Sequence, residues 1–427
     1  MPNDLTDINN FSGRLQTQFE LIEEIDAAAD RQALRRWGQT QDVADTTLID
    51  RLKNIRLLAL RSDQRLVDMD KADVLSQLAA FAQGSHPDVP DDGLAGGTIR
   101  QYRQAVRLFF RDELDREWAE DITIGQAERT PIGPDQILTG DEVDALLEHS
   151  DDARDTALFA VLCVTGQRIT AALSIRMGDV DLDDRVGTIR LNDDAKGLKG
   201  ASGPRPVLWA RPYIASWLNQ HPCPHDADAP LFCATQSGER PREDGDVVTW
   251  AVGDPMSRSQ AATRLRAVAE RAGVDTAKVK PHNFRHTAIT RMRDQGVPDD
   301  RIKFMVGVDP ESDILERYDK ATNEKMLERI RSDHGMDVDD DLVVGRPSLE
   351  QCPQCGSPLR GSARFCPQCG MPLDSEAADT IEDGKENLED TMVEALPDAD
   401  SDTIEKVLQV KRLLDDPSVR ELLDEGH

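Results

Sequence analysis

The 427-residue sequence has no long apolar run, and so no segment matching the roughly 20 residues of a membrane-spanning helix. Its first residues, Met-Pro-Asn-Asp-Leu-Thr-Asp, have neither the basic nor the apolar region of a signal peptide. We therefore expect a soluble, cytoplasmic protein with no membrane partner. A chain of this length is expected to hold two or three domains.

Aromatic residues and positive charge are also scarce. Phe, Trp and Tyr make up 4% of the chain, and 81 acidic residues outweigh 51 basic ones, which gives a net charge of -30. Such a charge opposes binding to nucleic-acid phosphates, unless concentrated salt screens the repulsion within a few ångströms. Abundant aspartate along the whole chain and little lysine beside arginine favour a halophilic cytoplasm. Residues 258–293 form a local basic island.

The seven cysteines are an odd number, which argues against a framework of disulfides. Four of them form two repeated knuckles, Cys352-Pro-Gln-Cys355 and Cys366-Pro-Gln-Cys369, a spacing typical of tetrahedral zinc. Four thiolates leave no open position on the metal, so we expect one structural zinc. Residues 350–373 resemble a zinc ribbon of the FCPxCGxPL type.

A weaker metal pattern occurs in a proline-rich loop that holds Cys223, His225 and Cys233. This loop lacks a CxxC knuckle, so we interpret the three as ordinary loop residues rather than as a second metal site. Cys163, in an apolar segment, is interpreted as a small buried hydrophobe.

The residues best suited to chemistry lie between 281 and 318. His282 and Arg285 are three apart in a segment of helical periodicity, which places both side chains on one helix face. Tyr318 follows a short distance downstream. Arginine binds phosphate oxygens with a bidentate fork, histidine holds or moves a proton near neutral pH, and tyrosine can act as a covalent nucleophile. The combination therefore indicates phosphate chemistry.

A second stretch upstream makes this interpretation more specific. It reads TGQRITAAL at residues 165–173 and leads to DVD at 179–181. Together with HNFRHT at 282–287 and the later Tyr318, it resembles the tyrosine recombinases, the phage-integrase and Xer-type family. In that family the first box reads TGxRIsELLxLxxxDID and the second HxLRHT, and the last ends in the nucleophilic tyrosine. The resemblance spans about residues 45–330.

The resemblance implies a mainly α fold of the α+β class. A helical core-binding domain is expected at 45–130, and a catalytic domain of helices with a small antiparallel sheet at 136–335. Residues 1–44 are polar with weak periodicity and are interpreted as an N-terminal extension, most simply a solvated one. The zinc ribbon at 350–373 is followed by an acidic segment, 374–427, that ends in a short amphipathic helix.

Two local signals support the predicted boundary between these domains. Pro131, Gly133 and Pro134 lie in a stretch without periodicity, which indicates a linker. Thr139 and Glu142 then form the capping-box pattern that opens a helix. Before the linker, one predicted helix has arginine on a single face, which would contact DNA in a core-binding domain or else be merely solvated: Arg100, Arg103, Arg107 and Arg111.

The resemblance also implies roles for individual residues. Tyr318 would attack a DNA phosphodiester and form a 3'-phosphotyrosyl link, without ATP or a catalytic metal. Arg168 and Arg285 would hold the phosphate oxygens, and His282 would contact the same phosphate or assist proton transfer. The partner would be double-stranded DNA, bound by a homo-oligomer, a tetramer on paired sites.

A catalytic lysine is expected on the hairpin at residues 195–203, between strands at 186–191 and 205–209. Counting from the first strand favours Lys196 and counting back from Arg205 favours Lys199, so both remain candidates. Either lysine would protonate the departing sugar oxygen.

Two positions depart from the family pattern. Ala171 stands where an acid is usual, and Val308 stands where His or Trp is usual. Both departures remove polar contacts and favour a competing function, that of a non-catalytic DNA-binding or regulatory relic of a recombinase. Two further functions compete: a type IB topoisomerase, which shares the chemistry, and an acidic interaction scaffold, which only the net charge supports.

Overall fold

The computed structural model describes residues 4–126, 131–182, 187–241 and 247–318, and scattered residues between 352 and 373 (352, 355, 357, 359, 365, 366 and 368–373). The chain divides into two compact units, one of Asn10–Thr130 and one of Met1–Asn9 with Pro131–His427. Within the described ranges no helix is long and apolar enough to cross a membrane. The predicted acidic segment and helix at 374–427 lie outside the described residues.

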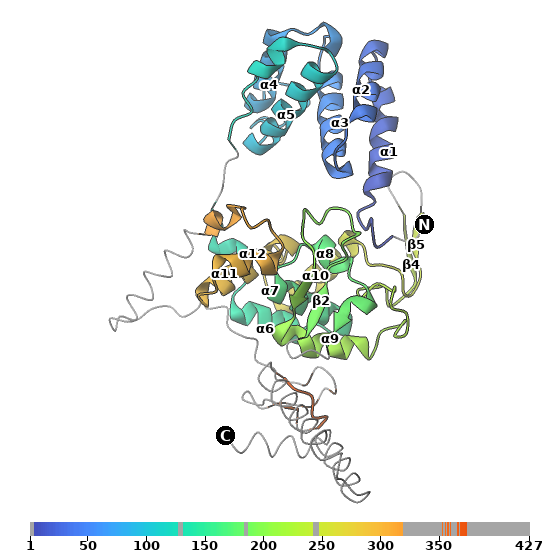
Figure 1. Ribbon diagram of the computed structural model, residues 1–427, viewed down its shortest axis with the longest axis vertical. Helices are drawn as coiled ribbons and strands as arrows, with labels where there is room; N and C mark the ends of the chain where they lie inside the picture. Colours follow the sequence, from blue (N-terminus) through green and yellow to red (C-terminus); the bar gives the residue numbers. More distant parts are fainter. Residues whose placement is uncertain are drawn as a thin grey trace, which may run out of the picture. The chain divides into compact units, whose positions relative to one another are not determined.

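The first unit is helical (Figure 1). Its core is closed by large side chains with at most 2% of their surface exposed, including Trp37, Phe81, Tyr102 and Phe109, and the rings of Trp37 and Phe109 meet edge to face at 5.3 Å. Its elements are α1 (Phe11–Leu21), η1 (Ile22–Glu24), α2 (Ala28–Thr40), α3 (Asp45–Leu60), η2 (Leu66–Asp68), α4 (Lys71–Gln83), α5 (Gly96–Asp112) and η3 (Glu117–Asp121).

The structure corrects the interpretation of residues 1–44 as a solvated extension. Helix α1 packs on α3, and Ile22, Leu34 and Trp37 are at most 1% exposed in the same core as α3 to α5. Leu34 and Trp37 are three apart and so share one face of α2. Arginine and glutamine cover the rest of that helix and dilute its apolar periodicity, which explains why the sequence signal was weak.

The second unit, called the catalytic unit below, is built around one buried helix. Helix α7 (Ala153–Thr165) has eleven buried residues and packs against α6, α9 and α11. A helix that is apolar on all sides is stable only inside a core. Around it lie η4 (Pro134–Gln136), α6 (Gly140–Glu148), α8 (Ile169–Leu173), η5 (Met177–Asp179), η6 (Leu208–Ala210), α9 (Arg211–Leu218), α10 (Arg258–Ala272), α11 (Pro281–Asp294), α12 (Asp299–Val306) and η7 (Ile314–Tyr318).

Two small antiparallel sheets complete the catalytic unit. Strands β1 (Val180–Asp181), β2 (Thr188–Arg190) and β3 (Pro204–Pro206) pair in that order, with Ile189 opposite both Val180 and Arg205. Strands β4 (Gly238–Pro241) and β5 (Val247–Trp250) form a separate pair. The mainly α fold with a small antiparallel sheet is confirmed, and so is the hairpin between β2 and β3. Trp209 lies in η6 rather than in the expected second strand.

Residues 4–9, named the N-terminal strap here, belong to the catalytic unit although the helical unit follows them directly. Leu5 and Ile8 are buried in its core. The side chain of Asn9 donates to Thr170 Oγ1 on α8 at 3.0 Å. The catalytic unit is therefore assembled from two separate stretches of sequence.

Candidate active site

Arg168 emerges from a tight turn between two buried helices. Helix α7 ends at Gly166, whose φ of 58° suits glycine and whose added Cβ would lie 3.0 Å from both Ala288 and Val306. Arg168 is the N-cap of α8, and its Nη1 donates to the carbonyls of Gly307 at 3.2 Å and Leu198 at 3.4 Å. The guanidinium group is thereby held between the end of α12 and the β2–β3 hairpin.

Arg285 lies on α11 with only 3% of its surface exposed. Its Nη1 donates to the carbonyls of Gly166, at 2.8 Å, and Val306. Its Nη2 is buried and has no hydrogen-bond partner. Burial and then the charge of Arg168 lower the pKa of Arg285 to about 10. A buried donor without an acceptor, next to a second positive charge, is energetically unfavourable. A bound anion would accept the hydrogen bond and offset both charges.

His282 and His286 are four residues apart on α11, and their rings meet edge to face with centroids 4.4 Å apart. Crowding by neighbouring atoms lowers the pKa of His282, and the positive charges of Arg285, Arg317, Arg168 and Lys199 lower it further. His282 is therefore neutral near pH 7, and it lies within the electrostatic reach of both arginines.

Tyr318 ends η7 and is 2% exposed. The phenol oxygen lies 2.6 Å from Nδ1 of His286, which is also buried. Burial raises the pKa of Tyr318 to about 12, against the opposing charges of Arg285, Arg317 and Arg293. The structure thus brings Tyr318 to the helix that carries His282 and Arg285.

The two candidate lysines have different surroundings. The positive charge of Lys199 acts on His282, and Lys199 follows Leu198, whose carbonyl accepts from Arg168. Lys196 instead meets the N-terminal strap: its backbone N–H donates to Thr6 O at 2.7 Å, and its Nζ lies 3.9 Å from Asp7 Oδ2. Of the two, Lys199 is therefore the one whose charge acts on His282.

The two departures from the family pattern are both accommodated by apolar packing. Ala171 is 1% exposed in a small cluster with Leu191, Leu198 and Ala201, which fastens the hairpin to α8. Val308 is half-buried against the core of the catalytic unit. Gly307, with φ of 64°, allows the hairpin to approach, because an added Cβ would lie 2.6 Å from the Cβ of Ala201. At Ala171 and Val308, hydrophobic contacts therefore replace the polar side chains of the family pattern.

Comparison with known proteins finds similarity over both the catalytic unit and the ribbon. The profile of the phage integrase family matches residues 136–325, and that of the zinc-ribbon domain matches 351–373. The tyrosine recombinase XerD of Mycobacterium tuberculosis is 29% identical over 271 residues, which cover 60% of this chain and 80% of the relative. The tyrosine recombinase XerA of Thermococcus onnurineus is 24% identical over 218 residues, 51% of this chain and 68% of the relative. Residues 136–325 form a phage-integrase domain, so the chain is a tyrosine recombinase.

Among solved structures, that of the XerH site-specific recombinase bound to palindromic difH substrate, a post-cleavage complex, is 16% identical, with a TM-score of 0.47. The match covers 78% of this recombinase and 99% of that chain. Family membership makes the chain a DNA strand breaking and rejoining enzyme.

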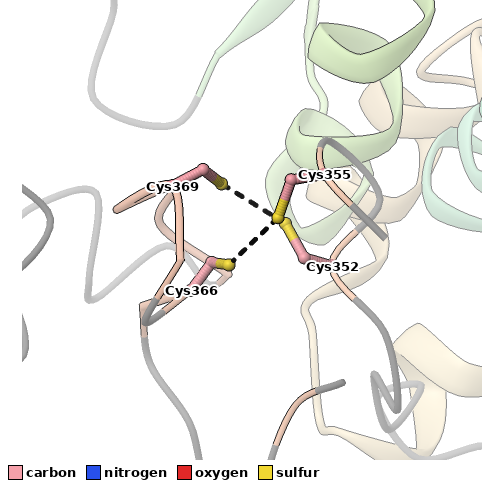
Figure 2. Close-up of side chains that lie close together, drawn as sticks. All are labelled: Cys352, Cys355, Cys366 and Cys369. Carbon is pink, nitrogen blue, oxygen red and sulfur yellow. Dashed lines mark hydrogen bonds between the residues drawn. The ribbon is translucent and has the colours of Figure 1, made fainter. Parts of the chain in front are cut away.

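The ribbon of the recombinase brings its four cysteines together. Figure 2 shows the sulfurs of Cys352, Cys355, Cys366 and Cys369 pointing toward one another, and all four lie within 4.8 Å of each other. The Cys352–Cys369 and Cys355–Cys366 sulfurs are 3.6 and 3.5 Å apart. Zinc–sulfur bonds of about 2.3 Å place tetrahedral sulfurs about 3.8 Å apart, so the cluster fits zinc.

Within the described parts of the recombinase, this is the one group of three or more metal-ligand residues close enough to share an ion. The loop with Cys223, His225 and Cys233 does not form another. There the buried Cys233 thiol lies 3.5 Å from Nε2 of His221, whose two ring nitrogens also contact the Pro230 carbonyl and the Cys223 backbone N–H. These contacts are typical of loop packing.

The predicted arginine face of α5 is engaged within the helical unit. Arg107 and Arg111 form ion pairs with Glu120 of η3. Arg100 donates to the carbonyl of Gly125 at 3.3 Å, and Arg103 donates to that of Thr123 at 3.5 Å. These contacts hold the segment after α5 in place. The ion pairs with Glu120 also offset part of the positive charge of this helix face in the absence of DNA.

His286, which contacts Tyr318, was not among the residues predicted from the sequence. The residue is the second histidine of HNFRHT, and its i, i+4 spacing from His282 places both on one face of α11. That spacing was a usable signal, but the contact with Tyr318 depends on how η7 folds back. The backbone N–H of Ile132 donates to Arg317 O at 3.1 Å and anchors η7 there.

Proposed function

We propose that this recombinase cuts and rejoins double-stranded DNA at specific sites with Tyr318 as the nucleophile. The observation that carries the proposal is the unpartnered Nη2 of Arg285, buried near the guanidinium group of Arg168 and the phenol of Tyr318. A phosphodiester brings the negative charge and the acceptor oxygens that this cluster lacks.

The two arginines act on the phosphate. Arg168 and Arg285 hold its non-bridging oxygens and offset the charge that builds in the transition state. His282, neutral near pH 7, donates a further hydrogen bond to the same group. Two fixed guanidinium charges supply what a divalent cation provides in other phosphoryl-transfer sites, so the reaction needs no catalytic metal.

The bond exchange conserves energy. Tyr318 Oη attacks the phosphorus, an O–P bond forms to the 3'-phosphate side, and the bond from phosphorus to the 5'-oxygen breaks. The 5'-oxygen takes a proton from Lys199 and leaves as a free hydroxyl. Attack by a 5'-hydroxyl on the phosphotyrosyl link reverses these steps, which is why no ATP is consumed.

Lys199 is the better candidate for the general acid. Its charge reaches His282, whereas the ammonium group of Lys196 lies 3.9 Å from Asp7 Oδ2 of the N-terminal strap. Lys199 also has a positive φ of 55°, which is uncommon for a residue with a side chain. Such strain is frequent at functional sites, and here it supports the choice of Lys199.

A nicked substrate tests the proposal. A nick just beyond the cleavage point lets the short fragment that carries the new 5'-hydroxyl diffuse away, which traps the covalent protein–DNA adduct. The purified full chain, incubated with this DNA in molar salt, should yield an adduct that denaturants leave intact, and Tyr318→Phe should yield none. The high salt is chosen because the acidic composition fits a halophilic cytoplasm.

Ala171 and Val308 favour one competing function, a relic that binds DNA without cutting it. Such a relic would bind DNA and give no adduct from the nicked substrate. Relaxation of supercoiled DNA without exchange between paired sites would instead identify a type IB topoisomerase.

The remaining parts of the proposal concern assembly. The four-cysteine cluster holds one structural zinc ion. The active form is a homo-oligomer, a tetramer on paired DNA sites. The arginine face of α5 contributes phosphate contacts once its pairs with Glu120 open.

A further inference from the structure

The contact between His286 and Tyr318 goes beyond the roles assigned above. Nδ1 of His286 lies 2.6 Å from the phenol oxygen, and both side chains are 2% exposed. The two ring centroids are 5.5 Å apart, with the rings tilted by 58°. A short contact between two buried polar groups is an ordered hydrogen bond with little access for competing water.

Burial and the groups around the pair fix its protonation. His282 and Arg285 on α11 and Arg317 on η7 face His286, and Arg293 also acts on Tyr318. Burial first, and then these neighbours, lower the pKa of His286 to about 3, whereas burial raises that of Tyr318 to about 12. At neutral pH the phenol therefore keeps its proton and donates it to an unprotonated Nδ1, while Nε2 carries the imidazole hydrogen.

We propose that His286 is a further catalytic residue, whose Nδ1 accepts the proton of Tyr318 as the phenol oxygen attacks the phosphorus. The proposal rests on the assignment of Tyr318 as nucleophile. The Tyr318 proton moves to His286, the new O–P bond forms, the bond to the 5'-oxygen breaks, and Lys199 donates a proton to that oxygen. In the rejoining step His286 returns its proton to the departing phenol oxygen.

The same geometry explains why the nucleophile stays protonated until DNA binds. Without a bound phosphate, the arginines around His286 oppose a further positive charge on its ring. A phosphodiester held by Arg168 and Arg285 brings a negative charge that offsets them. Proton transfer is thereby coupled to the binding of the phosphate.

Single-turnover cleavage of the nicked substrate tests this role. In His286→Asn the amide oxygen stands near the position of Nδ1 and still accepts a hydrogen bond, but it cannot take up a proton. We expect a rate about a hundredfold below wild type at pH 7, in the range usual for loss of a general base. The ratio of variant to wild-type rate should rise about tenfold per pH unit between pH 6 and 9, because the phenol must then ionise unaided.

A more acidic phenol provides the rescue. The chain has three tyrosines, so global replacement by 3-fluorotyrosine alters only Tyr102 and Tyr213 besides the nucleophile. The fluorinated His286→Asn protein should regain at least tenfold in rate, and the fluorinated wild-type protein should change little. His149→Asn, an exposed histidine of the same unit, is the matched control. If His286→Asn does not fold, as judged by thermal unfolding and DNA binding, His286→Gln is tested in its place.

The outcomes separate the two assignments. A near-wild-type rate in His286→Asn, or a reduced rate with the wild-type pH profile and no fluorotyrosine rescue, would overturn proton transfer and leave His286 a packing residue. An adduct that persists in Tyr318→Phe would overturn the nucleophile itself, and the role of His286 with it.

Discussion

Replacing Arg285 by lysine tests the centre of the proposed site. Nη1 of Arg285 donates to the carbonyls of Gly166 and Val306, and its buried Nη2, which has no hydrogen-bond partner, is the donor proposed to bind the phosphate. Lysine has one ammonium group, which cannot reach the carbonyls and the phosphate in the same geometry. The substitution preserves charge and removes the fork, so it isolates the contribution of directed hydrogen bonds.

The expected loss can be estimated from this arrangement. One preorganised donor aimed at developing charge is typically worth a hundred- to a thousandfold in rate, about 3 to 4 kcal/mol. Arg285→Lys should therefore be slowed by that factor. Arg168→Lys should be slowed similarly, because its Nη1 is also engaged by two carbonyls. DNA affinity should fall only slightly, since many other phosphate contacts remain.

Single-turnover cleavage of the nicked substrate measures the effect on both arginine variants, and binding to intact DNA is measured in parallel. Arg266→Lys, on the exposed side of α10, is the matched control and should cleave at the wild-type rate. A near-wild-type rate in either Arg168→Lys or Arg285→Lys would mean that this arginine does not contact the scissile phosphate. The DNA-binding relic would then become the better explanation.

The other predictions concern the nucleophile, the acid and the ribbon. Tyr318→Phe should abolish the covalent adduct and leave DNA binding nearly intact, as seen on a denaturing gel beside a binding assay. Lys199→Ala should lose cleavage and recover it on DNA with a 5'-bridging sulfur, because the sulfur leaves without taking up a proton. Lys196→Ala should show neither effect. The reverse pattern would make Lys196 the general acid instead of Lys199. By metal analysis, the purified, reduced protein should contain one zinc per chain, and Cys352→Ser should lower that content. A chain ending at residue 335 should still fold. A reduced protein without metal would refute the zinc assignment.

Much of the catalytic unit follows from local sequence. The periodicity of the segment after His282 predicts α11, and the capping box at Thr139 and Glu142 predicts α6, because both signals act within one or two helical turns. The turn at Gly166 likewise places Arg168 at the start of α8. Such features depend on neighbours in the chain, and the sequence contains them directly.

The features that the sequence did not predict depend on contacts between distant residues. The different surroundings of Lys196 and Lys199 depend on the strap, since Thr6 and Asp7 contact Lys196, whereas the charge of Lys199 acts on His282. The burial of Trp37 required α3 to α5 as partners. No periodicity contains this information, because each contact joins surfaces that exist only after folding.

The N-terminal strap has a consequence for how the protein is made. Residues 4–9 leave the ribosome before the rest of the catalytic unit, yet Asn9 bonds Thr170, which is 161 positions later in the chain. The helical unit can fold while Leu5 and Ile8 still lack the core that buries them. We expect the strap to dock late in synthesis, after α8 and the β2–β3 hairpin have formed. A fragment begun at residue 131 would therefore leave apolar surface uncovered, and we expect it to aggregate unless a peptide of the first residues is supplied.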